Sequence, residues 1–322
     1  MKKMTLLFPG QGSQSPGMGK FLFNEFKIAQ QTFEEASDSL GLDLKKLCFD
    51  SSESELALTE NTQPALLCVS TATARVLTEK IGVTIHASAG HSIGEYASFV
   101  AGGVLSFSDA MRAVRLRGQS MQAASPQGSG GMLAVLGLED EQVQWLCQNT
   151  ETKSGYNPLS PANFNSPGQI VISGNLKAIE WLKNNFKPEE IPGQPKRAKL
   201  IPLNVSAPFH CALMRPAQEK MAHFFNTVHF KDSKFPIIQN VHAKAETNAG
   251  ILKDNLVRQI SLPVLWTQSM QELVRAQLTN CIEAGHGSIV KGLCKKIDSE
   301  RLIVMSAQNL EDIKAIENYL AE

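Results

Sequence analysis

The chain has 322 residues, of which 43% are hydrophobic and 19% are charged, and its 31 basic residues are balanced by 31 acidic ones. This composition is typical of a globular protein with one large core or two unequal domains. Balanced charge supplies no general attraction to nucleic acid, and no run of about 18 apolar residues predicts a membrane span. Six scattered cysteines without a C-x-x-C pair favour buried thiols in a reducing cytoplasm over a zinc or disulfide framework.

The first third of the chain predicts an α/β arrangement. A short apolar strand runs into the glycine loop PGQGSQ at residues 9–14, and residues 20–48 follow with helical spacing. A buried helix is expected from Leu66, a strand from Thr84 to a glycine turn, and a further helix with Ser108 as its N-cap. The glycine loop does not fit a nucleotide site, because Ser15 stands where the dinucleotide pattern needs glycine and Phe21 follows Lys20.

The middle of the chain predicts a separate small subdomain. After a break at residues 125–131, the pattern indicates strand, helix, two strands, helix and strand, over Met132–Leu138, Asp140–Asn149, Ala162–Asn165, Gln169–Ser173, Leu176–Phe186 and Ala198–Asn204. This order is ferredoxin-like. We therefore predict a small subdomain over residues 129–199, inserted in a large α/β subdomain built from residues 1–128 and 200–322.

The segment AGHSIGEY, residues 89–96, contains G-x-S-x-G with Ser92 at its centre. A predicted strand precedes it and a predicted helix follows, which is the context of a nucleophile elbow. The helix start would direct backbone N–H groups and its positive dipole end toward an oxygen that becomes anionic beside the serine. Ser92 is the candidate nucleophile, and a glycine-rich turn with a capping serine is the alternative.

A nucleophilic serine needs a base, and seven histidines are present. His210 follows a predicted strand in a loop stiffened by a proline, from which an imidazole can reach the elbow. His223 and His229 are interpreted as packing residues, whereas His242 and His286 remain open as alternatives. No acidic residue lies at an obvious orienting position, so a backbone carbonyl is expected to fix the imidazole tautomer in a serine–histidine dyad.

Arg117 falls within about 40° of the apolar stripe of its predicted helix, at 100° per residue. A guanidinium there needs an anionic partner, because an unpaired buried charge is costly. One alternative is an internal ion pair with Glu95. The other is a substrate carboxylate, which arginine can bind through two parallel hydrogen bonds.

These motifs give the chain a resemblance to the acyltransferase family of fatty acid and polyketide synthesis, which includes the malonyl-CoA:acyl-carrier-protein transacylases. The similarity runs nearly from end to end, and several blocks in one order are far more specific than any single one. The blocks are FPGQGSQ at 8–14, TQPALL at 62–67, GHSIGEY at 90–96, LRGQSMQ at 116–122, NSPGQIVISG at 165–174, SAPFHCALM at 206–214, PVLWTQSM at 263–270 and EAGHGS at 283–288.

The resemblance implies a fold and a set of roles. The fold is an α/β-hydrolase-like large subdomain with an inserted ferredoxin-like small one. The implied roles are acylation of Ser92, general base catalysis by His210, binding of the malonyl carboxylate by Arg117, an oxyanion hole from the Gln11 and Ile93 N–H groups, orientation of the histidine by the Gln259 carbonyl, and pocket lining by Gln63, Asn165 and Phe209.

The function implied is transfer of a malonyl group from malonyl-CoA to the phosphopantetheine thiol of holo acyl carrier protein in fatty acid synthesis. We expect no cofactor or metal and a monomeric protein. The alternatives are a trans-acting acyltransferase of polyketide synthesis, a hydrolase that removes acyl groups from carrier proteins, and a non-catalytic carrier-binding scaffold. The presence of Arg117 argues against the hydrolase, since such relatives tend to lose that arginine.

The chain departs from the family pattern at two positions. Ile93 stands where leucine is usual, which is a small change beside the pocket. His242 stands where the family often has aspartate, so a second histidine near the site is a hypothesis. Phe209, before the base, fits the pattern of malonyl-selective members.

Overall fold

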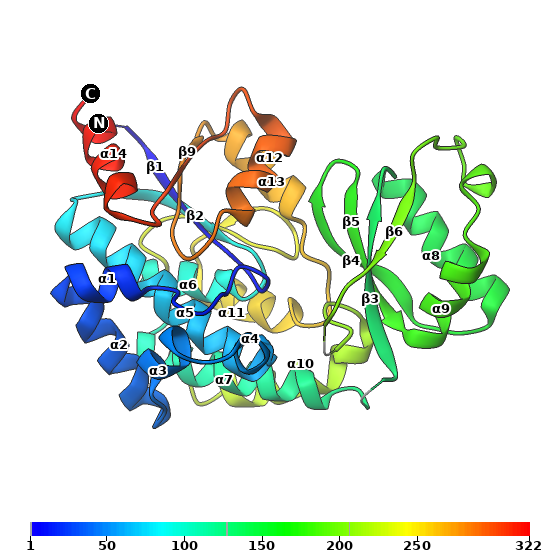
Figure 1. Cartoon of the computed structure of the whole chain (residues 1–322), viewed down its shortest axis with the longest axis horizontal. Coiled ribbons are helices and arrows are strands. Elements are labelled where there is room, and N and C mark those ends of the chain that lie inside the picture. The colour runs from blue at the N-terminus through cyan, green and yellow to red at the C-terminus, as the bar shows by residue number, and fades with distance from the viewer. Residues whose placement is uncertain (1, 127, 206) are drawn as a thin grey trace.

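Two β-sheets organise the chain in the computed structural model, which describes residues 2–126, 128–205 and 207–322. Gln127 in the predicted break and Ser206 at the start of the histidine block lie outside the described residues. The larger sheet has the strand order β10-β9-β1-β2-β7-β8, and the smaller has the order β4-β5-β3-β6. Figure 1 shows the smaller sheet and its helices on one side of the molecule, and both chain ends at the opposite side.

Strand β1 (Met4–Phe8) lies in the middle of the larger sheet, and all five of its residues are buried. A strand covered on both faces carries a continuous apolar run rather than an alternating one, as this segment does. The other strands of this sheet are β2 (Ile85–Gly90), β7 (Ile237–Ile238), β8 (Ala245–Glu246), β9 (Asn280–Glu283) and β10 (Ile303–Ser306). Strands β1, β2 and β7 run parallel, so their carboxyl ends meet at one edge of the sheet.

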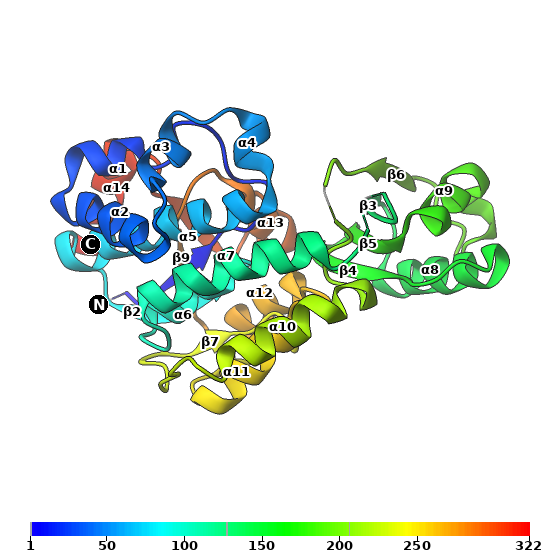
Figure 2. The same ribbon diagram turned by 90° about the horizontal axis from the view of Figure 1, so that it is seen from below.

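Helices surround the larger sheet and supply most of the core. They are α1 (Lys20–Glu25), α2 (Lys27–Leu40), α3 (Leu44–Phe49), α4 (Glu53–Ala57), α5 (Thr59–Arg75) with a π-helical turn (Val76–Lys80), α6 (Gly94–Ala101), α7 (Phe107–Ala123), α10 (Arg215–Phe225), α11 (Ala249–Arg258), α12 (Trp266–Arg275), α13 (Ile289–Asp298) and α14 (Leu310–Ala321), and a short 3-10 turn (Ala212–Met214) precedes α10. Within the described ranges, none of these helices is long and apolar enough to cross a bilayer. Figure 2 shows α7 and α10 running side by side toward the smaller sheet.

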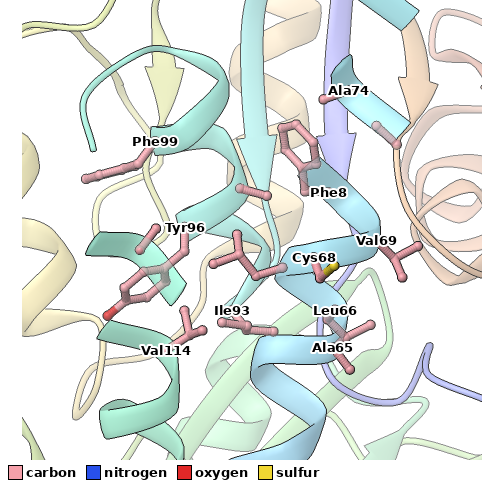
Figure 3. Close-up of a cluster of buried hydrophobic side chains, with 14 of the residues drawn as sticks. Phe8, Ala65, Leu66, Cys68, Val69, Ala74, Ile93, Tyr96, Phe99 and Val114 are labelled. Atoms are coloured by element: carbon pink, nitrogen blue, oxygen red, sulfur yellow. The ribbon is translucent and has the colours of Figure 1, made fainter. Parts of the chain in front are cut away.

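The core joins β1, α5, α6 and α7 directly behind the elbow. Phe8, Leu66, Ile93, Tyr96 and Val114 are buried together there, as Figure 3 shows. Helix α5 is buried along most of its length, which agrees with the buried helix predicted from Leu66. All six cysteines are free and buried, as their spacing predicted.

The smaller sheet has the predicted order of elements. The sequence of elements is β3 (Gly130–Leu136), α8 (Asp140–Ser154), β4 (Leu159–Ser166), β5 (Gln169–Asn175), α9 (Leu176–Asn185), a 3-10 turn (Pro188–Glu190) and β6 (Lys199–Pro202). Its strands pair antiparallel, and the helices pack through a separate apolar cluster. The predicted fold class, a large α/β subdomain with a ferredoxin-like insertion, is therefore confirmed. The limits at 128/129 and 199/200 stay a prediction.

The predicted N-cap of α7 was wrong. The cap is Ser106, whose hydroxyl accepts a hydrogen bond from Asp109 N at 3.1 Å. Ser108 lies inside the helix, where its hydroxyl accepts a hydrogen bond from Arg112. Ser106 and Ser108 stand two residues apart. The helix begins after Ser106, whose side chain satisfies the exposed backbone N–H of Asp109 in the first turn.

The two subdomains are joined by backbone hydrogen bonds as well as by chain connections. Phe164 N donates to Val264 O at 2.9 Å, and Val264 N donates to Ala162 O at 2.8 Å. Strand β4 is thereby fixed to the segment that leads into α12. The small subdomain consequently supplies a wall of defined position beside the elbow.

Candidate active site

Ser92 occupies the sharp turn between β2 and α6, with the left-handed backbone angle φ 52°. Such an angle is costly for a residue other than glycine and persists where surrounding contacts enforce it. A Cβ on Gly90 would overlap the Gly94 backbone, and one on Gly94 would lie 2.8 Å from Pro9 O. The two glycines therefore let the strand, the turn and the helix approach closely enough to form the elbow.

Asn240 holds this turn from the neighbouring strand, and the sequence analysis missed it. Its Oδ1 accepts from Ser92 N at 2.8 Å, and its Nδ2 donates to Gly90 O at 2.7 Å. The available signal was topological. Asn240 lies just beyond β7, which runs parallel to β2, so both strands end beside the elbow.

Ser92, His210 and Gln259 form a continuous hydrogen-bonded chain. Ser92 Oγ lies 2.8 Å from His210 Nε2, and His210 Nδ1 lies 2.8 Å from the backbone oxygen of Gln259. A carbonyl oxygen can only accept, so Nδ1 carries the proton and Nε2 is free to accept from the serine hydroxyl. The structure thus brings together the three residues that the sequence analysis grouped, with a carbonyl in the place of an acid.

The environment of His210 keeps its imidazole neutral. The ring is buried, and burial together with the nearby positive charge of Arg117 lowers its pKa to about 3. A group with a lowered pKa stays deprotonated above that pKa. His210 is therefore able to accept a proton throughout the neutral pH range.

Arg117 is buried beside the dyad, with 2% of its surface exposed. Its guanidinium donates to Gln63 Oε1 at 2.9 Å, to Gln259 Oε1 at 2.8 Å and to Ser92 Oγ at 3.1 Å. Every one of these acceptors is a neutral group, and Nε has no hydrogen-bond partner among the residues that the structure describes. Burial lowers the pKa of the guanidinium, which nevertheless remains charged because that of arginine starts so high.

Within the described part of the chain, Arg117 and Glu95 do not form the ion pair that was the alternative prediction. The Glu95 carboxyl accepts from Asn240 N at 3.0 Å and from Gln259 Nε2 at 2.5 Å. Burial raises the pKa of Glu95 to about 8, and its hydrogen-bond donors and the Arg117 charge oppose that rise. The side chain of Gln259 lies between the two residues, where it accepts from Arg117 and donates to Glu95.

Two backbone N–H groups near the serine are unoccupied. Within the described ranges, neither Gln11 N nor Ile93 N has a hydrogen-bond partner, whereas Ser92 N is bound by Asn240. The glycine loop runs close to the elbow, since a Cβ on Gly10 would lie 2.7 Å from His91 O. Gln11 and Ile93 thus offer free donors for a developing oxyanion.

The site opens into a cavity of about 190 Å³ between the two subdomains. Each of the site residues predicted from the sequence lines it except Gln259, which lies behind Arg117 and His210. Asn165 accepts a hydrogen bond at 2.8 Å from His91 Nε2 and so connects the small subdomain to the elbow. Phe209, Met121, Met132, Val171, Leu203 and Val205 give the cavity an apolar side.

His91 lines this cavity beside His210, whereas the other histidines weighed from the sequence do not. His242 is hydrogen-bonded to Asn255 and to Lys244 N and does not line the cavity, so the hypothesis that it stands near the site stays a prediction. His286 contacts the Ser15 hydroxyl at 2.7 Å. His223 and His229 are exposed and do not pack in the core, because they lie on the outer side of their segment.

This geometry is the one by which enzymes activate a serine for nucleophilic attack. Residues 5–316 match the family described as acyl transferase domain, and the chain belongs to that family.

Similar proteins cover nearly the whole chain. A malonyl CoA-acyl carrier protein transacylase of Salmonella typhimurium is 42% identical over 297 residues, which are 92% of this chain and 93% of that protein. The structure of the enzyme of that name from Coxiella burnetii has a TM-score of 0.92 at 33% identity and covers 100% of this chain and 98% of its own. A malonyl transacylase solved with its type II polyketide acyl carrier protein has a TM-score of 0.91 at 39% identity, covering 99% and 100%.

The lowered pKa of His210 predicts that its imidazole does not titrate in the neutral range. Nuclear magnetic resonance of isotope-labelled histidine should show a neutral His210 ring with the proton on Nδ1 from pH 8 down to about pH 5, where an ordinary histidine is protonated. In Arg117→Ala, which removes a nearby positive charge, the midpoint should rise. A His210 midpoint near 6.5 in the unaltered protein would contradict this electrostatic description.

Proposed function

We propose that this enzyme transfers a malonyl group from malonyl-CoA to the phosphopantetheine thiol of acyl carrier protein through a malonyl ester on Ser92. Membership of the acyl transferase domain family and the names of its relatives support the reaction class and the two substrates. The position of Arg117 supports the choice of a dicarboxylic acyl group.

The observation that carries this proposal is the missing counter-ion of Arg117. A buried charge without an anionic partner is strongly unfavourable. Within the described part of the chain, the guanidinium makes its hydrogen bonds only to neutral groups and Nε has no partner. A carboxylate at the far end of the acyl group would supply both the charge and the acceptor. Arg117 contacts Ser92 Oγ, so that carboxylate would be held within reach of the nucleophile.

The proposed reaction proceeds in two matched half-reactions. His210 takes the proton of Ser92 Oγ as that oxygen attacks the thioester carbonyl, and the Gln11 and Ile93 N–H groups stabilise the oxyanion by about 3 kcal/mol each. Collapse breaks the carbon–sulfur bond, and the imidazolium protonates the departing coenzyme A thiolate. In the second half, His210 takes the proton of the carrier thiol, which attacks the malonyl ester and releases Ser92 with its proton restored.

We further propose that the enzyme serves fatty acid synthesis in the cytoplasm as a monomer. One chain supplies all of the proposed catalytic groups, so the mechanism needs no partner copy.

Acyl carrier proteins are acidic, so exposed basic residues are candidate contacts for them. Two such clusters are present, one of Lys196, Arg197 and Lys199 and one of Lys295, Lys296 and Arg301. Transfer to purified carrier proteins of the fatty acid and polyketide pathways distinguishes the two pathways.

Replacement of Arg117 by alanine is expected to reverse acyl selectivity. Loss of a buried charge pair costs about 2–5 kcal/mol, so kcat/KM for malonyl-CoA should fall by a factor of about 30 or more. Reaction with acetyl-CoA should improve, because the unpaired charge is gone. Steady-state assays with both thioesters test this, with Arg112→Ala as the control on the exposed side of the same helix. Unaltered malonyl preference in Arg117→Ala would refute the carboxylate clamp.

Replacement of Ser92 by alanine should abolish the covalent intermediate. Intact mass spectrometry after incubation with malonyl-CoA should detect a malonyl adduct on the unaltered protein and on Ser98→Ala, a control within α6, but not on Ser92→Ala. An adduct that persists on Ser92→Ala means that another residue is the nucleophile. In the same assay with carrier protein, free malonate in place of malonyl carrier protein would favour the hydrolase alternative.

A further inference from the structure

A chain of three side-chain hydrogen bonds, two of them buried and the third partly buried, connects Arg117 to the glycine loop. Arg117 Nη1 donates to Gln63 Oε1 at 2.9 Å, Gln63 Nε2 donates to Thr59 Oγ1 at 3.0 Å, and Thr59 Oγ1 donates to Gln11 Oε1 at 3.0 Å. Thr59 and Gln63 are each 1% exposed. The chain ends on Gln11, the residue whose backbone N–H faces the proposed oxyanion.

The cation at one end determines the direction of every hydrogen bond. A guanidinium can only donate, so the Gln63 amide must present its oxygen to Arg117 and its nitrogen to Thr59. Thr59 Oγ1 must therefore accept from Gln63, which leaves the hydroxyl proton for Gln11 Oε1. Thr59 is the one member of the chain that has to accept and donate through a single atom, and only a hydroxyl does both.

The Thr59 hydroxyl has no competing structural task in the described residues. It is the first residue of α5, but the cap position is Leu58 and no side-chain cap hydrogen bond is made there. For Gln11, the hydrogen bond from Thr59 is the side-chain anchor that the described residues provide. The loop backbone is held by internal hydrogen bonds such as Gly12 N to Gln14 Oε1 at 2.7 Å, but these do not involve Gln11.

Close packing makes the connection stiff. A Cβ on Gly118, the residue after Arg117, would lie 2.8 Å from Thr59 O and 2.7 Å from Glu60 Cα. The absence of that Cβ lets α7 contact the beginning of α5 directly. The backbones at Arg117 and at Thr59 are thus held at a fixed separation. A movement of the guanidinium must therefore be taken up by the side chains that connect it to Thr59.

We propose that Thr59 is a positioning residue that couples carboxylate recognition at Arg117 to the oxyanion loop at Gln11. This inference rests on the proposed malonyl transfer. A malonyl carboxylate bound to Arg117 fixes the position of the guanidinium, and the guanidinium in turn fixes the Gln63 amide. Through its two hydrogen bonds, Thr59 then fixes the Gln11 side chain, so that the Gln11 N–H faces the acyl carbonyl. An acetyl group has no carboxylate and does not engage this chain, so the loop contributes to selectivity although it never touches the carboxylate.

The test compares Thr59→Val, which keeps the shape and removes the hydroxyl, with Thr59→Ser, which keeps the hydroxyl. In assays with carrier protein, Thr59→Val should lower kcat for malonyl-CoA about tenfold with little change in KM, and acetyl transfer should fall much less. Thr59→Ser should stay within about twofold of the unaltered enzyme in both reactions. Thr59→Ala is measured alongside and should repeat the change in the malonyl-to-acetyl ratio, so the test does not depend on the folding of one variant.

Two outcomes separate this inference from the proposed function. If the unaltered enzyme does not transfer malonyl groups, the proposed function fails and the coupling fails with it. If the unaltered enzyme transfers malonyl but Thr59→Val and Thr59→Ala keep its malonyl-to-acetyl ratio, the coupling alone is overturned, since a merely structural role lowers both reactions equally. In an Arg117→Ala background, Thr59→Val should have no further effect on that ratio.

Discussion

A buried positive charge with no anionic partner is the constraint on which the rest of this site depends. The Arg117 guanidinium lies 3.1 Å from Ser92 Oγ, and burial together with its charge lowers the pKa of His210. Its own Nε has no hydrogen-bond partner among the described residues. Under the proposed function, a substrate carboxylate would supply the missing negative charge on binding. Burial and this positive charge together keep His210 neutral, and we propose that the same charge selects the acyl group.

Gln259 and Asn240 show how a polar core can hold several strained groups at once. Gln259 uses its backbone oxygen for His210, its side-chain oxygen for Arg117 and its amide nitrogen for Ser92 O and Glu95. Asn240 binds both sides of the elbow. Ser92 and His210 both have left-handed backbone angles, with φ of 52° and 58°, and such positions persist only where external hydrogen bonds enforce them. Glu95 completes this network through Gln259 and Asn240 and makes no hydrogen bond to Arg117 within the described residues.

The candidate catalytic residues were easier to predict from the sequence than the residues that position them. Ser92 lies in a spaced glycine motif, and Arg117 breaks an apolar stripe, so each leaves a local pattern. Asn240 and Thr59 leave none, because their role comes from strand order and from helices that meet only in the folded chain. Local spacing also misplaced the cap of α7, because two nearby serines offer similar cap signals. The ferredoxin-like order was predictable, since each of its elements carries its own hydrophobic period.

The most direct test of the central claim is a crystal structure of the enzyme trapped as its malonyl ester. We predict a malonyl carboxylate oxygen within about 3 Å of Arg117 Nε, with the ester attached to Ser92 Oγ and its carbonyl oxygen directed to Gln11 N and Ile93 N. A carboxylate that points out of the cavity, with Nε still unpaired, would contradict the account.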